Sequence, residues 1–261
     1  MQSLHQAVKD VKKSTTISAV KILYAGTGPF ATLVLPLISR FSPKELHFVF
    51  LEANLVSIEI LKKVVSALKI NDYVADFYHC DAANFILPDH IKDCDIVLIE
   101  CLQHALAREP QVAISYNLLP QMSGNPILIP EEIELSAAIL DYRFKFNDEN
   151  QLAPNSKIEY QSPPLFRINK EEIKKNKRSA SENLIFTPSE WRFDRAVISE
   201  ENNTLSILTK IKVYKEHELP KNASGLTLPL YLADLIREKD ITGVKAQYEI
   251  GLEPGLKVSY L

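Results

Sequence analysis

Short apolar runs separated by helical patterns dominate the first half of the chain. Residues 21–25, 47–52, 95–100 and 126–130 are such runs, and residues 73–80 alternate in part between apolar and polar side chains. Runs of this length, bounded by turns and separated by helical segments, are typical of strands in a parallel sheet. The pattern therefore predicts an α/β fold with a Rossmann-like, doubly wound sheet.

Apolar residues at helical spacing predict three helices around these strands. The first spans residues 4–13, and the second follows the glycine-rich turn at residues 26–31 and runs to about Arg40, with Pro29 in its first turn. The third follows residue 52 and presents one apolar face, formed by Ile58, Leu61, Val64, Val65 and Leu68.

Beyond Pro130 the pattern changes to closely spaced strands. They are expected at 133–142, 196–198, 204–208, 211–214, 226–232, 244–250 and 256–260. Close spacing with turn signals between strands favours an antiparallel sandwich or barrel. We therefore expect two domains, residues 1–130 and an all-β, barrel-like domain over residues 131–261. The polar interval 150–190, with its basic run at 174–178, is expected to be a solvated loop.

Composition narrows the classes of function. The 261 residues are 46% hydrophobic and carry a net charge of -3, so no basic field favours nucleic acid. No apolar run approaches the roughly 18 residues of a membrane span. The three cysteines, Cys80, Cys94 and Cys101, form no C-x-x-C pair, so neither a metal site nor a disulfide framework is expected. The amino terminus lacks a signal peptide, and we expect a cytoplasmic protein.

The turn after the first strand has the residues of a nucleotide-binding loop. Gly26, Thr27 and Gly28 precede Ala31, and Glu52 closes the second strand about two dozen residues later. Glycines permit a tight turn and the close approach of backbone N–H groups to a ligand, and an acid at the second strand end accepts hydrogen bonds from ribose hydroxyls. This pattern fits a dinucleotide such as NAD, because alanine is allowed at the last position.

The acids at the next two strand ends favour a different cofactor. Asp81 follows the third strand, where a carboxylate can accept from an adenine amino group, and Glu100 closes the fourth strand, where the reactive end of a cofactor lies. Acids after strands two, three and four, without a third glycine, resemble the class I S-adenosylmethionine (SAM) methyltransferases. NAD-dependent hydride transfer remains the alternative.

Two further segments resemble one family within that class, the protein arginine methyltransferases. Residues 100–109, Glu-Cys-Leu-Gln-His-Ala-Leu-Ala-Arg-Glu, have the spacing of that family's double-glutamate loop. Residues 127–132 resemble the Ile-Pro segment where its SAM domain passes into a β-barrel, and residues 25–30 are similar to the glycine loop of its symmetric-dimethylating branch. The likeness covers residues 15–142, and the barrel match is architectural.

The resemblance implies a role for each site residue. Gly26, Thr27 and Gly28 would line SAM, Glu52 would hold its ribose, and Asp81 with Ala82 would approach its adenine. Glu100 and Glu109 would clamp the guanidinium of a protein, peptide or small-molecule substrate, because two carboxylates match the donor fork of a planar cation. His104 lies inside this loop, either as a proton acceptor or as a histidine on a helix surface.

A second class of function stays open, a SAM-domain relic that binds without turnover. The intact spacing of Glu100 and Glu109 argues against it. Ile99 in place of the family's usual serine, the lack of a Thr-His-Trp-like barrel segment and the lack of tyrosine-bearing helices before the first strand argue for it. The family's dimerisation arm has only the polar stretch at about 170–182 as a candidate, so the sequence leaves the oligomeric state open and favours a monomer or a dimer of another kind.

Overall fold

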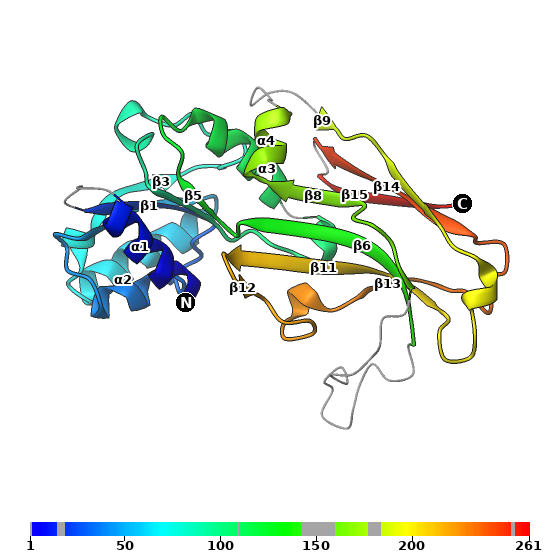
Figure 1. Cartoon of the computed structure of the whole chain (residues 1–261). Coiled ribbons are helices and arrows are strands. Elements are labelled where there is room, and N and C mark those ends of the chain that lie inside the picture. The colour runs from blue at the N-terminus through cyan, green and yellow to red at the C-terminus, as the bar shows by residue number, and fades with distance from the viewer. Residues whose placement is uncertain (1, 15–18, 109, 142–159, 177–183, 252–253) are drawn as a thin grey trace.

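A computed structural model describes residues 2–14, 19–108, 110–141, 160–176, 184–251 and 254–261. Two parts lie end to end (Figure 1). One holds a parallel sheet with helices around it, and the other consists of long antiparallel strands. Within these ranges no helix combines the length and the apolar content that crossing a bilayer requires.

The first part is built on a five-stranded parallel sheet in the order β3-β2-β1-β4-β5. Its strands are β1 (Val20–Ala25), β2 (Leu46–Glu52), β3 (Val74–His79), β4 (Ile96–Ile99) and β5 (Ile127–Ile129). Each matches a range that the apolar pattern predicts, with β1 and β2 beginning one residue earlier than predicted. All four residues of β4 are buried, as expected for a strand covered on both faces.

Three α-helices accompany this sheet: α1 (Gln2–Ser14), α2 (Leu55–Ala67) and α3 (Gln111–Leu118). α1 buries Leu4, Ala7, Val8 and Val11, as its periodicity predicts. Asn54 caps the amino terminus of α2, where its side chain accepts hydrogen bonds from the N–H groups of residues 56 and 57, and the helix buries Ile58, Leu61 and Val65. Leu68 lies beyond the end of α2 and is exposed, because the helix ends one residue earlier than its apolar face suggests.

The prediction of a helix from the glycine turn to Arg40 is wrong. The structure has turns over this segment and then one short 3-10 helix, η1 (Leu35–Ser39). Ala31 adopts a left-handed backbone with φ 42°, which interrupts a right-handed helix, and Pro36 removes a backbone donor. Further 3-10 turns are η2 (Asn71–Tyr73), η3 (Asp89–Ile91), η4 (His104–Leu106) and η5 (Leu119–Gln121).

The second part consists of two antiparallel sheets. One is organised around β6 (Glu132–Leu140) and β11 (Thr204–Tyr214), which pair along nine registered positions. β7 (Tyr160–Gln161), β8 (Phe166–Asn169), β12 (His217–Glu218) and β13 (Leu230–Asp234) join it. The other contains β9 (Leu184–Ile185), β10 (Ser189–Arg192), β14 (Gly243–Ile250) and β15 (Gly255–Tyr260). The predicted all-β, barrel-like architecture is confirmed.

Four details of the second part differ from the sequence prediction. The strand expected at 226–232 is instead the 3-10 helix η7 (Gly225–Thr227) followed by β13, because the hydroxyl of Thr227 closes a turn there by donating to the carbonyls of Pro220 and Ser224. Residues 196–198 are not a strand, because Asp194 caps the short helix η6 (Arg195–Val197) there. The strands expected at 204–208 and 211–214 form one continuous strand, β11. The interval 150–190 is not simply a loop, since its described residues include β7 to β10 and α4 (Lys170–Lys175); residues 150–159 and 177–183 lie outside the described ranges.

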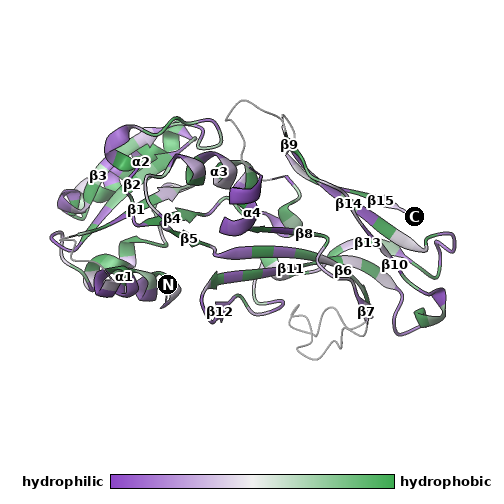
Figure 2. Cartoon of the chain, turned by 45° about the horizontal axis from the view of Figure 1, so that its top comes forward, coloured by the Kyte–Doolittle hydropathy of each residue, from purple (hydrophilic) through white to green (hydrophobic). Residues whose placement is uncertain are grey.

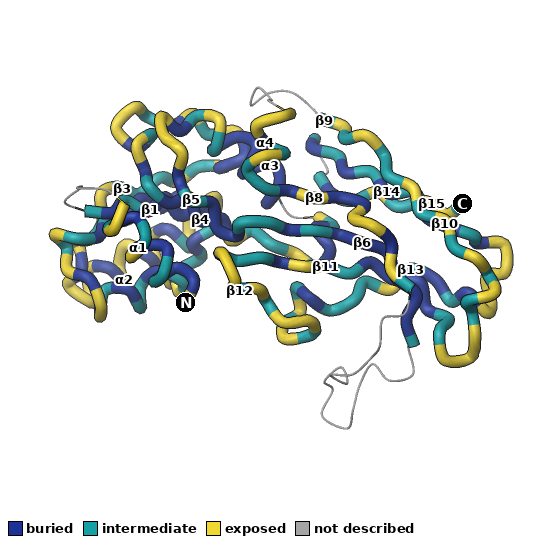
Figure 3. The backbone as a smooth tube through the Cα atoms, in the orientation of Figure 1, coloured by how far each residue is buried: buried dark blue, intermediate teal, exposed yellow. Residues whose placement is uncertain are grey.

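One hydrophobic core connects the two parts. It runs from Leu23 and Val97 in the parallel sheet through Ile133 to Leu205 and Val244 in the antiparallel sheets. Buried backbone follows the same path along β4, β6 and β11 (Figure 3). Apolar segments lie along β6 and β11, whereas α4 and β12 are polar (Figure 2). A second core beneath the parallel sheet holds α1 and α2 against the other face.

Candidate functional site

The strand order places a crevice at the carboxyl ends of β1 and β4. From β1 the chain proceeds to β2 and β3 on one side, and β4 and β5 lie on the other side. Loops that leave neighbouring strands in opposite directions part at this switch point, where open α/β sheets bind their ligands. A cleft of about 400 Å³ lies there, lined by Gly26, Thr27, Gly28, Pro29, Phe30, Thr32, Glu52, Glu100, Cys101 and Leu102.

Strand register aligns three of the predicted site residues in one row. Ala25 lies opposite Leu51 of β2 and opposite Ile99 of β4. The next residue along each chain is Gly26, Glu52 or Glu100, and the backbone ladder continues, with the N–H of Gly26 bonded to the carbonyl of Leu51 at 3.0 Å and that of Glu100 to the carbonyl of Ala25 at 3.0 Å. The two carboxylate residues therefore flank the glycine turn.

Gly26 is required at its position for two reasons. Its φ of 81° is unfavourable for other residues, and a Cβ there would lie 2.7 Å from the carbonyl oxygen of Glu100 and 2.4 Å from the sulfur of Cys101. Gly28 also has a positive φ, 55°, but nothing lies within 4 Å of its missing Cβ. The first glycine thus permits the loop after β4 to cross it, and the second leaves open space in the cleft.

Glu52 ties the glycine loop to the start of α2. One carboxylate oxygen accepts the N–H of Gly28 at 2.8 Å and the hydroxyl of Thr27 at 3.4 Å, and the other accepts the N–H of Asn54 at 2.9 Å. A carboxylate offers about four lone-pair sites, so Glu52 keeps capacity for a further donor. The side chain expected to meet a ribose thus also fixes the shape of the loop.

Asp81 and Ala82 lie beside the cleft rather than in its lining. Asp81 is exposed and caps its own turn, accepting the N–H of Ala83 at 2.9 Å and the side-chain amide of Asn84 at 2.7 Å. Ala82 is buried, and its carbonyl accepts the side-chain amide of Asn117 from α3 at 2.9 Å. The predicted adenine contact is compatible with this place at the end of β3 and stays a prediction.

The loop after β4 is fastened at several points. The buried side chain of Gln111 accepts the N–H of Cys101 at 3.0 Å. His104 is the first residue of η4, is half-buried, and donates from its Nε2 to the carbonyl of Leu228. The buried residues Ala105 and Leu106 both have positive φ values, 54° and 53°. Such strained backbone persists only where surrounding contacts enforce it, and it clusters at functional sites.

The barrel-like part also packs closely against this loop. At the start of β15, Gly255 has a φ of 156°, and a Cβ there would lie 2.1 Å from the carbonyl oxygen of Ala107. Glu100 is exposed at the near end of the loop. Glu109, its predicted partner at the far end, lies outside the described residues. The structure therefore fixes where the loop begins and where it meets the barrel.

Gln111 and Asn117 support the site, although sequence analysis did not select them. Both are buried polar residues of α3, where all eight residues are buried. Asn117 also donates to the carbonyl of Phe85 at 2.8 Å, so α3 holds the loop after β3 as well as the loop after β4. The sequence signal that could have identified both residues was the presence of amide side chains in a mostly apolar helix, because buried amides require hydrogen-bond partners.

The charged side chains in the described lining of the cleft are all acidic. Its described lining contains the carboxylates of Glu52 and Glu100 and no lysine, arginine or histidine. Burial, followed by the negative charges of Asp81 and Glu52, raises the pKa of the nearby Cys80 thiol to about 12, so that thiol stays protonated and is a poor nucleophile. The acidic lining suits a cationic ligand.

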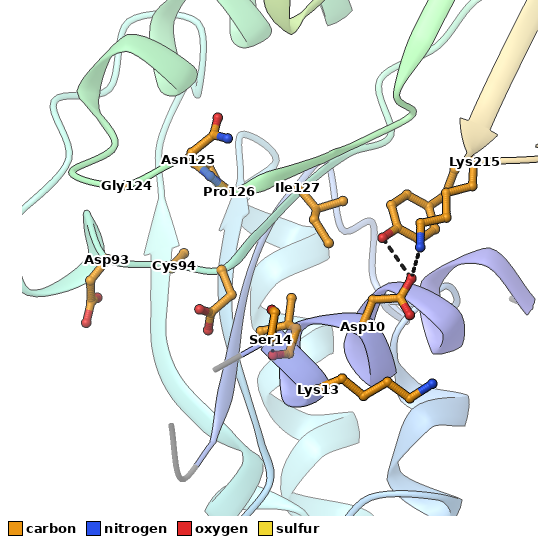
Figure 4. Close-up of a pocket in the computed structure, with 13 residues that line it drawn as sticks. Asp10, Lys13, Ser14, Asp93, Cys94, Gly124, Asn125, Pro126, Ile127 and Lys215 are labelled. Carbon is orange, nitrogen blue, oxygen red and sulfur yellow. Dashed lines mark hydrogen bonds and ion pairs between the residues drawn. The ribbon is translucent and has the colours of Figure 1, made fainter. Parts of the chain in front are cut away.

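A larger cavity, of about 590 Å³, lies at the opposite edge of the sheet (Figure 4). It is bounded by the end of α1, the turns before β4 and β5, and Lys215, the residue after β11. Asp10 there accepts hydrogen bonds from the Tyr214 hydroxyl at 3.0 Å and the Lys215 ammonium at 2.5 Å. Because ligands of parallel sheets bind at the carboxyl ends of the strands, we assign the smaller cleft as the candidate site.

Comparisons with known proteins agree with this architecture. A scan of protein-family models and a search of curated proteins find no match. Among solved structures, protein arginine methyltransferase 10 of Arabidopsis thaliana matches with a TM-score of 0.55 at 11% identity, over 95% of this chain and 83% of that chain. A proposed S-adenosyl-L-methionine-dependent methyltransferase of Methanococcus maripaludis matches at 18% identity over 37% of this chain and 41% of that chain, with a TM-score of 0.28, which carries no argument. The chain thus has the fold of an arginine methyltransferase, a Rossmann-like domain followed by a barrel-like domain.

Alanine substitutions at the two glycines should separate steric blockage from backbone strain. Gly28→Ala adds only left-handed strain, so we expect a loss of about 1 kcal/mol of unfolding free energy. Gly26→Ala adds a clash with backbone, and the combined loss should reach about 3 kcal/mol. Chemical denaturation measures both. Equal losses in the two variants would contradict the close approach of the loop after β4.

Proposed function

We propose that this protein is a SAM-dependent methyltransferase whose cofactor binds in the cleft between the glycine turn and Glu100. The observation that carries this proposal is the row formed by Glu52, Gly26 and Glu100 at the switch point of the sheet. The fold shared with an arginine methyltransferase supports it.

The residues present fit such a cofactor. The open space beside Gly28 and the hydroxyl of Thr27 leave room and a polar partner at the cleft wall. The remaining lone pairs of Glu52 suit the hydroxyls of a ribose. When bound, SAM supplies a methyl group on a positively charged sulfur, and the carboxylates of Glu52 and Glu100 provide a negative field that favours this cation over a neutral ligand.

We further propose that the methyl acceptor is a guanidino group of a protein, a peptide or a small molecule. Glu100 would accept hydrogen bonds from the guanidinium, and Glu109 would provide the second carboxylate from the far end of the same loop. Charge-assisted, paired hydrogen bonds hold a planar cation in one orientation, and orientation supplies much of the rate enhancement of a transfer reaction. The contacts of Cys101 and His104 support this role, because they fasten the loop between the two acids.

Cofactor binding tests the first step of the proposal. Titration calorimetry should detect binding of SAM and of its demethylated product, S-adenosylhomocysteine, and no binding of NAD. Glu52→Ala should weaken SAM binding at least tenfold, because it removes both the ribose acceptor and the partner of the Gly28 N–H. Glu59→Ala, at an exposed carboxylate on α2, is the matched control and should bind as the wild type does.

The calorimetry has two unfavourable outcomes. Binding of NAD without SAM would replace the methyltransferase by an oxidoreductase. Binding of SAM without any transfer to arginine-bearing peptides would instead identify the binding module that the sequence leaves open.

Substitutions in the acid pair test the second step. Glu100→Gln and Glu109→Gln keep size but remove a charge, and a guanidinium that loses a charge-assisted partner binds about 2 to 5 kcal/mol more weakly. We expect methyl transfer to an arginine peptide library, read by mass spectrometry, to fall more than tenfold in each variant. SAM affinity should change little in Glu109→Gln, and Glu190→Gln, on β10 of the barrel-like part, should transfer normally. Undiminished transfer in both loop variants, or methyl groups on oxygen or carbon, would exclude the guanidinium clamp.

A further inference from the structure

Tyr24 of β1 is buried completely, yet its hydroxyl has no hydrogen-bond partner. Among the described residues, the buried polar side-chain atoms in this condition are the hydroxyls of Tyr24, Ser206, Thr209, Ser224 and Tyr248. Only Tyr24 belongs to the parallel sheet. An unsatisfied buried hydroxyl costs about 1 to 3 kcal/mol, so each such group calls for an explanation.

The surroundings of the Tyr24 ring do not require a hydroxyl. The ring lies edge-on to Phe50 with centroids 6.5 Å apart, in a cluster that also contains Phe48 and is lined by Phe77. A phenylalanine at position 24 would keep these contacts and avoid the unsatisfied oxygen. Departures from the locally most stable residue are expected at functional sites.

Sheet register places Tyr24 on β1 two residues before Gly26, next to the strand ends that form the candidate site. Tyr24 lies opposite Phe50 of β2 and Leu98 of β4. All three face the second core, which packs against α1 and α2. Their neighbours in the chain face the opposite side of the sheet, in the core that connects the two parts. Because side chains alternate along a strand, the residues two positions further, Glu52 and Glu100, leave the sheet on the same side as Tyr24.

Electrostatics agree with this placement. Burial raises the pKa of Tyr24 above its ordinary value, and the negative charge of Glu100 is the largest contribution from another group, followed by Cys101 and Glu52. The phenol therefore stays protonated at neutral pH and keeps a proton that it can donate to a hydrogen bond. The titratable groups that face it are Glu52 from β2, with Glu100 and Cys101 from the end of β4, and the described cleft lining adds no lysine, arginine or histidine.

We propose that Tyr24 is a positioning residue for Glu100, whose carboxylate accepts a hydrogen bond from the Tyr24 hydroxyl when the cofactor fills the cleft. This inference rests on the proposed methyl transfer. A filled cleft excludes water, so a carboxylate that turns inward needs a donor from the protein. A neutral phenol orients the carboxylate without cancelling the charge that the cationic acceptor requires, whereas a lysine or arginine would cancel it.

The test compares Tyr24→Phe with Tyr248→Phe, which removes the unpartnered hydroxyl of another buried tyrosine in the barrel-like part. Carbon-13-labelled glutamate reports the titration of Glu100 by NMR in the presence of S-adenosylhomocysteine, and the loss of its signal in Glu100→Gln assigns it. Losing a donor to the charged form disfavours that form, so Tyr24→Phe should raise the pKa of Glu100 by about one unit. Tyr248→Phe should leave it unchanged.

Two further measurements distinguish positioning from a structural role. Thermal unfolding of both Phe variants should occur at or above the wild-type midpoint, because each loses only an unsatisfied hydroxyl. Transfer to the arginine peptides by Tyr24→Phe should fall about tenfold, with S-adenosylhomocysteine affinity within twofold of wild type.

Each contrary result points to a different failure. An unchanged Glu100 titration in Tyr24→Phe, or a clear loss of its thermal stability, overturns the positioning role while the methyltransferase stands. A wild-type protein that binds neither SAM nor S-adenosylhomocysteine overturns the proposed function and this inference together.

Discussion

The crossing of the loop after β4 over Gly26 is the contact on which the candidate site depends. The carbonyl of Glu100 and the sulfur of Cys101 occupy the space that any Cβ at position 26 would need. This close approach lets Glu100 and Glu52 stand on either side of one turn, each at the end of its own strand. A parallel sheet brings strand ends to one edge, but only a glycine permits these loops to approach so closely.

The barrel-like part contributes to the site by holding that loop in place. His104 bonds to a carbonyl in the turn before β13, and Gly255 of β15 lies against the backbone of Ala107. From the other side, Gln111 of α3 holds Cys101. The left-handed residues Ala105 and Leu106 are enforced by these contacts, since neither adopts that backbone readily alone. The antiparallel sheets are therefore part of the scaffold of the acidic loop, and the continuous core gives this scaffold its rigidity.

How far the sequence predicts this structure depends on the range of the forces involved. The strands of the parallel sheet were predictable because buried runs such as 96–99 are local signals, and the row of Gly26, Glu52 and Glu100 followed from strand ends that share an edge. The absence of a helix after the glycine turn was not predictable, because the left-handed backbone of Ala31 is set by tertiary packing. The hydrogen bond from His104 to Leu228 was not predictable either, because it joins residues 124 positions apart. The unpartnered hydroxyl of Tyr24 is likewise invisible in a sequence, where a tyrosine in an apolar strand looks like ordinary core.

A crystal structure of the protein with S-adenosylhomocysteine tests most directly where the cofactor binds. We expect density for the ligand in the cleft at the carboxyl ends of β1 and β4, with its ribose at Glu52 and its sulfur facing Glu100. Density in the larger cavity beside Asp10 and Lys215, or a ribose that contacts neither glycine loop nor Glu52, would contradict it.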